Sequence, residues 1–319
     1  MLSLLMALLL FAGGTALLLL GADWFLGGAG ELARVLGMSA LVLGVILAGL
    51  EPEEMLTAAV ASARGAPGLA VGNVVGTNVT IVTAALGLSA LLCPLVISRG
   101  VRRQALIATL VSLVPMILLF LGSVSQAEGI LLLALFVGYT FFLVRTDREA
   151  IRRLAASENE DDDERETPGN PRGAWKPLLL TCGGLAAMAV GGPSIVEGAL
   201  RLAEISRIDQ GAVGATIVSL GTGAEMLALG VSAARKKRPD VLVGGILGSF
   251  AYNLLVTLGL AAAIHPLSVE PRLAFLALPI MIAAHLALLA LIWYGKIPRL
   301  AGGLLIAAYL AYLLVVVLA

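Results

Sequence analysis

Long apolar runs, separated by short polar stretches, occupy most of this chain from its first residues to its last. Residues 1–20 and 301–319 are both almost entirely apolar. A helix needs about 20 apolar residues to cross the hydrocarbon core of a bilayer. The pattern therefore predicts ten membrane-spanning helices, at residues 2–24, 38–62, 68–95, 103–122, 127–145, 175–204, 210–234, 240–264, 272–294 and 298–318.

The composition agrees with this pattern. Hydrophobic residues make up 59% of the 319 positions and charged residues only 13%, a balance that excludes an ordinary soluble domain. The formal net charge is zero, so nothing favours a nucleic acid as a partner. We expect an all-α, multi-pass integral protein of the cell membrane, with the lipid bilayer as its surroundings and a monomer as a plausible state.

The distribution of Lys and Arg predicts how the helices are oriented. With the N-terminus outside, the inner loops hold seventeen Lys and Arg residues and the outer loops hold four. Positive residues concentrate on the cytoplasmic side of membrane proteins. Both termini are therefore expected outside, which also requires an even number of spans.

The chain matches itself at an offset of 172 residues. Residues 49–88 align without a gap to 221–260, and ten of the forty positions are identical. The identical pairs include Glu53/Glu225, Pro67/Pro239, Gly72/Gly244 and Gly76/Gly248. Five predicted spans separate equivalent positions, so the second copy runs opposite to the first. Inverted repeats of this kind are typical of secondary transporters, which bind substrate where the repeats meet.

The repeat divides the chain into two five-helix halves, residues 1–146 and 175–319. Between them, residues 147–174 are rich in Asp and Glu. We expect this segment to be a solvated cytoplasmic linker, and a role in sensing Ca²⁺ is the alternative.

Carboxylates lie where lipid-facing residues are expected. Glu51, Glu53 and Glu54 fall in the second predicted span and Glu225 in the seventh. A charge at membrane depth costs about 2.5–3.5 kcal/mol on insertion scales, so such residues usually have a function. Glu51 and Glu54 share one helix face because they are three residues apart, and Glu53 points to another.

Oxygen-rich side chains from both repeats accompany these acids. Ca²⁺ prefers six to eight oxygen ligands, and no cluster of His or Cys favours a softer metal. The candidate cation ligands are Glu51, Glu54, Glu225, Thr77, Thr222, Ser249 and Asn253. The alternative is that the acids only bond to neighbouring helices or line a vestibule. No nucleophile–base spacing is present, so we expect neither an enzyme nor a cofactor.

Several stretches resemble the sodium/calcium exchangers of the calcium/cation antiporter superfamily. They are Ala22-Asp23-Trp24-Phe25, Ala66-Pro67-Gly68, Gly72-Asn73-Val74-Val75-Gly76-Thr77-Asn78, Leu86-Gly87-Leu88-Ser89-Ala90, Val196-Glu197-Gly198-Ala199, and Gly248-Ser249 with Asn253. The resemblance covers nearly the whole chain and implies ten helices in two inverted halves, in a divergent member of the prokaryotic type.

In that family each repeat carries a Gly-Thr-Ser-x-Pro-Glu signature, whose glutamate is a central ion ligand. The resemblance places Glu54 on the first glutamate and Thr77 on the first serine of the neighbouring helix. It places Thr222 on the second threonine, Ser249 on the second serine, and Asn253 on the acidic or amide position.

This chain departs from the family pattern at several of these positions. Glu51 replaces a serine, Met226 stands where the second glutamate belongs, and Ile81 stands where the first repeat should offer an amide. A thioether is a poor ligand for Ca²⁺. Either Glu51 supplies the negative charge that is missing at Met226, or the side chain of Glu225, one position before Met226, turns toward the ion.

The expected function is secondary antiport of cations. Ca²⁺ would exchange against Na⁺ or H⁺ by alternating access to one midplane carboxylate site. One alternative is transport of another cation, monovalent or divalent. The other is a family-derived membrane scaffold without transport, which the substitutions at Met226 and Ile81 favour.

Overall fold

The computed structural model describes residues 2–35, 51–97, 99–146, 175–235 and 239–318. Within the first half, the elements are α1 (Leu2–Val35), α3 (Pro52–Ala63), α4 (Pro67–Thr80), η1 (Ile81–Ala85), α5 (Leu86–Leu92), β1 (Leu95–Val96), α6 (Arg99–Phe120), β2 (Ser123–Val124) and α7 (Gln126–Thr146). The η elements are single π-helical turns that continue the α-helices beside them.

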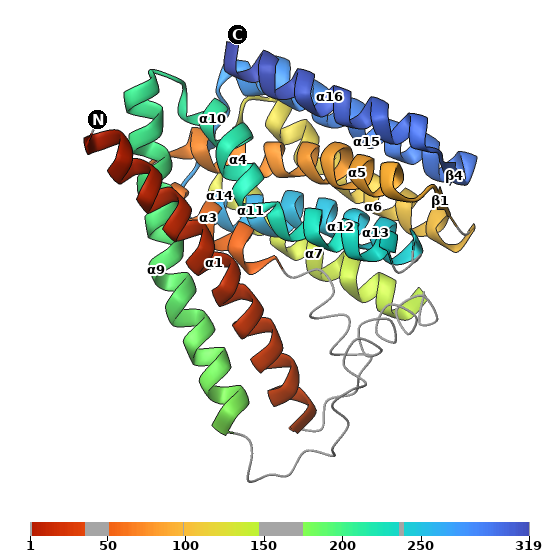
Figure 1. Cartoon of the computed structure of the whole chain (residues 1–319), viewed down its shortest axis with the longest axis horizontal. Coiled ribbons are helices and arrows are strands. Elements are labelled where there is room, and N and C mark those ends of the chain that lie inside the picture. The colour runs from red at the N-terminus through yellow and green to blue at the C-terminus, as the bar shows by residue number, and fades with distance from the viewer. Residues whose placement is uncertain (1, 36–50, 98, 147–174, 236–238, 319) are drawn as a thin grey trace.

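The second half begins with a long helix, and its elements follow a similar order. They are α9 (Trp175–Ser206), α10 (Gln210–Val213), η4 (Gly214–Val218), α11 (Ser219–Thr222), α12 (Ala224–Arg235), α13 (Pro239–Tyr252), η5 (Asn253–Thr257), α14 (Leu258–Ile264), β3 (Leu267–Ser268), η6 (Leu273–Ala277), α15 (Leu278–Tyr294), β4 (Lys296–Ile297) and α16 (Arg299–Leu318). In Figure 1, α1 and α9 lie side by side and project from the bundle formed by the other helices.

The described residues contain eight helices that are long and apolar enough to cross a membrane. A ninth is formed if residues 210–222 and 224–231 are one span, which bends by 44° at Gly223. The seventh expected span is therefore broken at Gly223. Of the second expected span, residues 38–62, the part up to residue 50 lies outside the described residues, and α3 is its described part.

The local structure recurs at the offset of the sequence repeat. Helices α3, α4 and α5 and the turn η1 have bounds that differ by 172 residues from those of α12, α13, α14 and η5. The same offset relates β1 to β3, and an offset of 173 residues relates β2 to β4. The strands pair across the halves in antiparallel register, with Leu95 opposite Ile297 and Ser123 opposite Ser268. Two short strands of the first half are thus hydrogen-bonded to two short strands of the second half.

The long helices α1 and α9 pack through glycines spaced seven residues apart. Gly14, Gly21 and Gly28 face Gly191, Gly184 and Pro177 in antiparallel order, and a Cβ on any of the three α1 glycines would overlap the α9 backbone. Small residues let helix backbones approach closely. The spacing of seven keeps these residues on one face of each helix.

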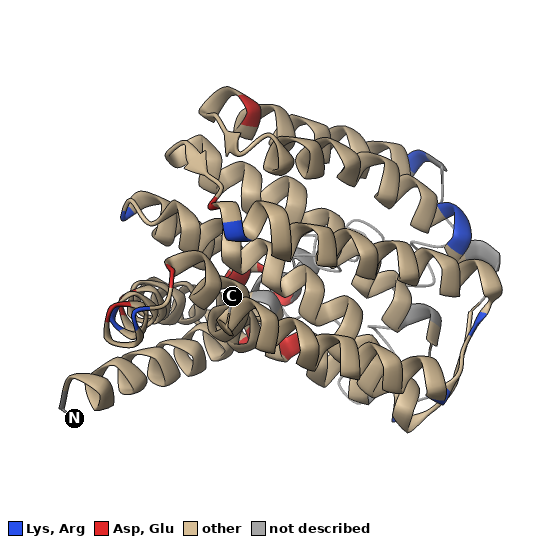
Figure 2. Ribbon diagram, turned by 90° about the horizontal axis from the view of Figure 1, so that it is seen from above, with Lys and Arg blue, Asp and Glu red and all other residues tan. Residues whose placement is uncertain are grey.

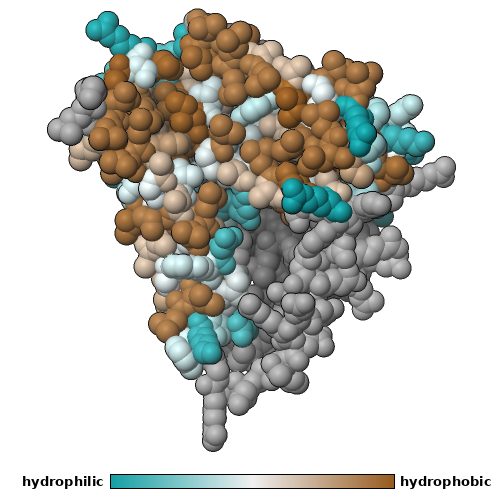
Figure 3. Space-filling view, viewed as in Figure 1, coloured by the Kyte–Doolittle hydropathy of each residue, from teal (hydrophilic) through white to brown (hydrophobic). Residues whose placement is uncertain are grey.

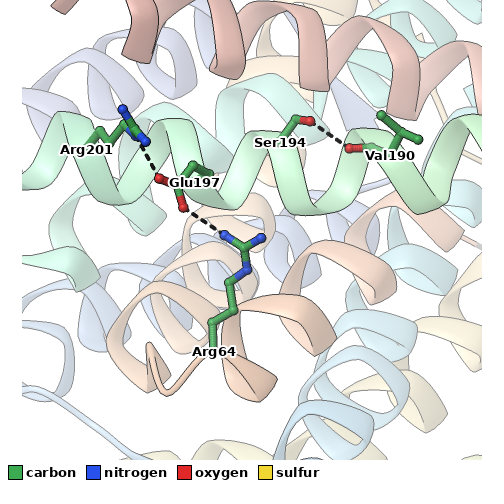
Figure 4. A network of polar contacts seen from close by, with 5 residues as sticks. All are labelled: Arg64, Val190, Ser194, Glu197 and Arg201. Atoms are coloured by element: carbon green, nitrogen blue, oxygen red, sulfur yellow. Dashed lines mark hydrogen bonds and ion pairs between the residues drawn. The ribbon is translucent and has the colours of Figure 1, made fainter. Parts of the chain in front are cut away.

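An ion pair ties α9 to the end of α3. Glu197 of α9 accepts hydrogen bonds from Arg201, four residues later, at 2.7 Å and from Arg64 at 2.9 Å (Figure 4). All three side chains are more than one-third exposed. Exposed pairs contribute at most about 1 kcal/mol, so this contact orients α9 more than it stabilises the fold.

Apolar side chains cover much of the outer surface. Figure 3 shows broad hydrophobic areas over the helices, and exposed large apolar residues occur on every long helix, for example Leu110, Leu185 and Leu304. Figure 2 shows acidic residues among the helices near the centre of the molecule, whereas Lys and Arg lie toward helix ends. An apolar outer surface around a charged interior is the arrangement that a bilayer favours.

Glu270 joins the starts of two central helices. Its Oε2 accepts a hydrogen bond from the backbone N–H of Gly211 at 3.2 Å, at the start of α10. Cβ atoms at Gly68, at the start of α4, and at Gly211 would overlap its carboxylate oxygens. Burial, together with the charge of Asp209, raises the pKa of Glu270 above its ordinary value of 4.5.

Glu270→Gln is therefore expected to make the protein melt at a higher temperature near neutral pH, by an amount equivalent to about 1 kcal/mol or less. A raised folded pKa means that the folded state binds the proton more tightly, so stability falls as pH rises above 4.5. The variant should lose this part of the pH dependence, measured by melting in detergent at pH 5 and pH 8. Equal pH dependence in both proteins would contradict the expectation.

Candidate functional site

The candidate site begins at the first turn of α3. Pro52 occupies its first position, where a missing N–H and a fixed φ favour the start of a helix. Glu53 and Glu54 follow in that turn, and Glu51 precedes it as the N-cap. All three carboxylates are at most 3% exposed. The positive end of the helix favours acidic groups at this position.

Glu54 is bound by side chains of α4. The amide Nδ2 of Asn73 donates to its Oε2 at 2.6 Å, and the Thr77 hydroxyl donates to its Oε1 at 2.8 Å. The hydroxyl of Thr222, at the end of α11, donates to the Oδ1 of Asn73 at 3.3 Å. This Glu54 group joins residues of both halves, and its four members are all buried.

Glu51 is bound from the second half of the chain. The Nδ2 of Asn253 donates to its Oε2 at 2.8 Å, although the residues are 202 positions apart. Ser249 lies one turn before Asn253 with its hydroxyl 3.5 Å from the same amide, and Thr257 donates to the Asn253 carbonyl oxygen at 3.1 Å. The other oxygen of Glu51, Oε1, is buried without a hydrogen-bond partner among the described residues.

Glu225 does not join either group. It is half-buried in the first turn of α12, and its carboxyl group lies near that of Glu53. The predicted ligands are thus divided between the Glu54 group, the Glu51 group of Ser249 and Asn253, and this third position. Within the described parts of the chain, no three acidic, His or Cys side chains could hold a metal by themselves. Hydroxyl and amide oxygens would therefore have to contribute ligands.

Asn73 was missed among the candidate ligands by reasoning from sequence. It lies four residues before Thr77, as Ser249 lies four before Asn253, so the same helical spacing could have identified it. Glu53 was predicted to point away from Glu51 and Glu54. In the sequence, only the equivalence of the two positions in the repeat connected Glu53 with Glu225.

Comparison with known proteins decides the family. The model for the sodium/calcium exchanger protein family matches residues 6–145 and 176–318. The chain belongs to this family. It is accordingly a multi-pass membrane transporter of the cation antiporter type, and the expectation that it is not an enzyme is confirmed.

Relatives of this exchanger are similar over nearly their full length. The putative antiporter CaxA of Alkalimonas amylolytica is 30% identical over 94% of this chain and 95% of its own. The sodium/calcium exchanger MaX1 of Methanosarcina acetivorans is 29% identical over 95% and 96%. A solved structure of the sodium-calcium exchanger NCX_Mj is similar with a TM-score of 0.62, at 26% identity and 97% coverage of both chains.

Two of the three departures from the family pattern, Ile81 and Met226, lie in apolar surroundings. Ile81 is fully buried at the start of η1, and Met226 is half-buried against the hydrophobic core. Neither side chain carries an oxygen atom. Glu51, by contrast, occupies a serine position of the family signature and meets the second half through Asn253.

Proposed function

We propose that this exchanger moves Ca²⁺ against Na⁺ or H⁺ by alternating access to a site formed by the Glu54 and Glu51 groups. The observation that carries the proposal is the hydrogen bond from Asn253 to Glu51, since it brings an acid of one half to the amide of the other. Two carboxylates with hydroxyl and amide oxygens match the preference of Ca²⁺ for many oxygen ligands.

In this proposal Glu51 replaces the carboxylate that the family has at the position of Met226. Glu54 is the principal ligand, Thr77 and Thr222 complete its side, and Ser249 and Asn253 complete the side of Glu51. The hydrogen bonds of the two groups hold these oxygens in place before an ion arrives, which lowers the cost of ordering them on binding. Ca²⁺ and its counter-ion compete for this one midplane site, which opens to each side of the membrane in turn.

The proposal includes an arrangement of the chain in the membrane. Residues 1–146 and 175–319 form two inverted five-helix halves, with both termini outside and residues 147–174 as a cytoplasmic linker. The recurrence of element bounds at an offset of 172 supports the two halves, and the excess of Lys and Arg in the inner loops supports the orientation. The plasma membrane is the proposed location.

Ca²⁺ uptake into vesicles under an imposed Na⁺ or pH gradient tests this function. Glu51→Gln is expected to reduce the apparent affinity for Ca²⁺ at least about tenfold, because outer-shell changes alone cost about 10–100-fold at metal sites. Glu204→Gln, on the exposed surface of α9, is the matched control and should behave as the unmodified protein. Uptake that neither gradient drives would reject the exchange of Ca²⁺.

The apolar surroundings of Met226 and Ile81 favour a second candidate, transport of a cation that needs fewer oxygen ligands. Competition of Ca²⁺ uptake by a series of monovalent and divalent cations separates the two. A scaffold without transport would show no stabilisation by any cation, whereas a bound cation raises the melting temperature by mass action.

A further inference from the structure

The seventh span contains a single π-helical turn, η4, shortly before the residue that reaches the candidate site, Thr222. In a regular α-helix the backbone N–H of Ser219 would donate to the carbonyl oxygen of Ala215, four residues earlier. In this turn it donates to the carbonyl oxygen of Gly214, five residues earlier. The Ala215 carbonyl therefore loses its ordinary helical partner. Single π-turns of this kind are rare and occur frequently at functional sites.

A tyrosine of the last helix binds the carbonyl that the π-turn frees. The hydroxyl of Tyr312, on α16, donates to the carbonyl oxygen of Ala215 at 2.9 Å, although the two residues are 97 positions apart. Tyr312 is only 1% exposed, and the Ser219 hydroxyl donates to the same oxygen at 3.0 Å. A buried carbonyl without a partner is costly, so the bond from Tyr312 favours the π-turn over other conformations of this segment.

The same carbonyl group packs against α4, which carries Asn73 and Thr77. A Cβ at Gly76 would overlap the backbone of Ala215, so the two helices meet there backbone to backbone. Tyr309, one turn before Tyr312, stacks on it with ring centroids 6.4 Å apart. The hydroxyl of Tyr309 lies 3.4 Å from that of Thr80, at the end of α4. Helix α16 thus contacts both α4 and η4 close to where they pack together.

We propose that Tyr312 is a positioning residue of this exchanger, which keeps the π-turn in place and thereby directs Thr222 toward Asn73. The inference rests on the proposed cation site, because Thr222 belongs to the Glu54 group. Conversion of η4 to a regular α-turn would rotate the residues after it by about 100° relative to those before it, since an α-helix has 3.6 residues per turn. Thr222 would then lose its hydrogen bond of 3.3 Å to Asn73.

Tyr312→Phe tests this role because it removes the hydroxyl and keeps the ring. The melting temperature of the purified full-length protein is measured in detergent during titration with CaCl₂ or NaCl, with choline chloride keeping the ionic strength constant. The variant should need about three- to tenfold more of the stabilising cation for a half-maximal effect, the range that the net contribution of one hydrogen bond gives. Tyr294→Phe makes the same change at a tyrosine that is 75% exposed and should respond as the unmodified protein does.

A double variant separates positioning from general stabilisation of the fold. If Tyr312 acts through Thr222, Tyr312→Phe should change cation affinity less than about twofold in a protein that already carries Thr222→Ala. An equal loss with and without the Thr222 hydroxyl would overturn the inference, as would an unchanged cation response in Tyr312→Phe alone. If Tyr312→Phe does not fold, Ser219→Ala, which removes the other hydroxyl from the same carbonyl, is judged by the same comparison. An unmodified protein that no cation stabilises would reject the proposed exchange, and this role with it.

Discussion

Replacing Glu54 by glutamine is expected to reduce cation affinity at least about a hundredfold, the upper end of what outer-shell changes cost at metal sites. Glu54 accepts hydrogen bonds from Asn73 and Thr77, which orient both of its oxygens. Glutamine keeps the size of the side chain but loses the charge and offers an N–H₂ group where an acceptor is needed. Transport in vesicles should fall to the level of vesicles without protein.

Two measurements distinguish this loss from a loss of folding. The variant should still elute as a single species in detergent and melt cooperatively, because the substitution removes a buried charge without changing volume. Glu204→Gln, exposed on α9, controls for removal of an acid and should transport normally. Uptake by Glu54→Gln at the normal rate and with normal affinity would rule out Glu54 as a cation ligand.

A methyl group added at Gly76 is expected to destabilise the protein by about 1–3 kcal/mol, the usual cost of overpacking a core. Gly76 of α4 packs directly on Ala215 of η4, and a Cβ would overlap the backbone carbonyl group of Ala215. Backbone atoms cannot rotate away as a side chain can. The helix that carries Asn73 and Thr77 would have to move away from the helix that ends at Thr222.

Gly76→Ala should therefore melt at a lower temperature and bind cations more weakly. Gly138→Ala in α7 is the matched control, because nothing lies within 4 Å of a Cβ at that position. Alanine favours a helix by up to about 1 kcal/mol over glycine, so the control should melt at the same temperature or slightly higher. If Gly76→Ala melted at the same temperature as Gly138→Ala, the two helices would be free to separate and the expectation would be wrong.

The sequence by itself determined the membrane character and the family of this protein. Long apolar runs require helices because a bilayer offers the backbone no other hydrogen-bond partner. Eight such helices, or nine with the bent pair at Gly223, are found in the described residues. Glu51 and Glu54 could be selected as candidate ligands because a carboxylate in an apolar segment is costly wherever the helix packs.

Only the tertiary structure decided which side chains meet. Asn253 donates to Glu51 across 202 residues, Asn73 donates to Glu54, and Glu225 lies near Glu53. Spacing along one helix predicts which residues share a face of that helix. It does not predict which face of a second helix packs against them. That choice depends on close packing between helices, as between Gly76 and Ala215, because backbones approach only where side chains on both helices are small.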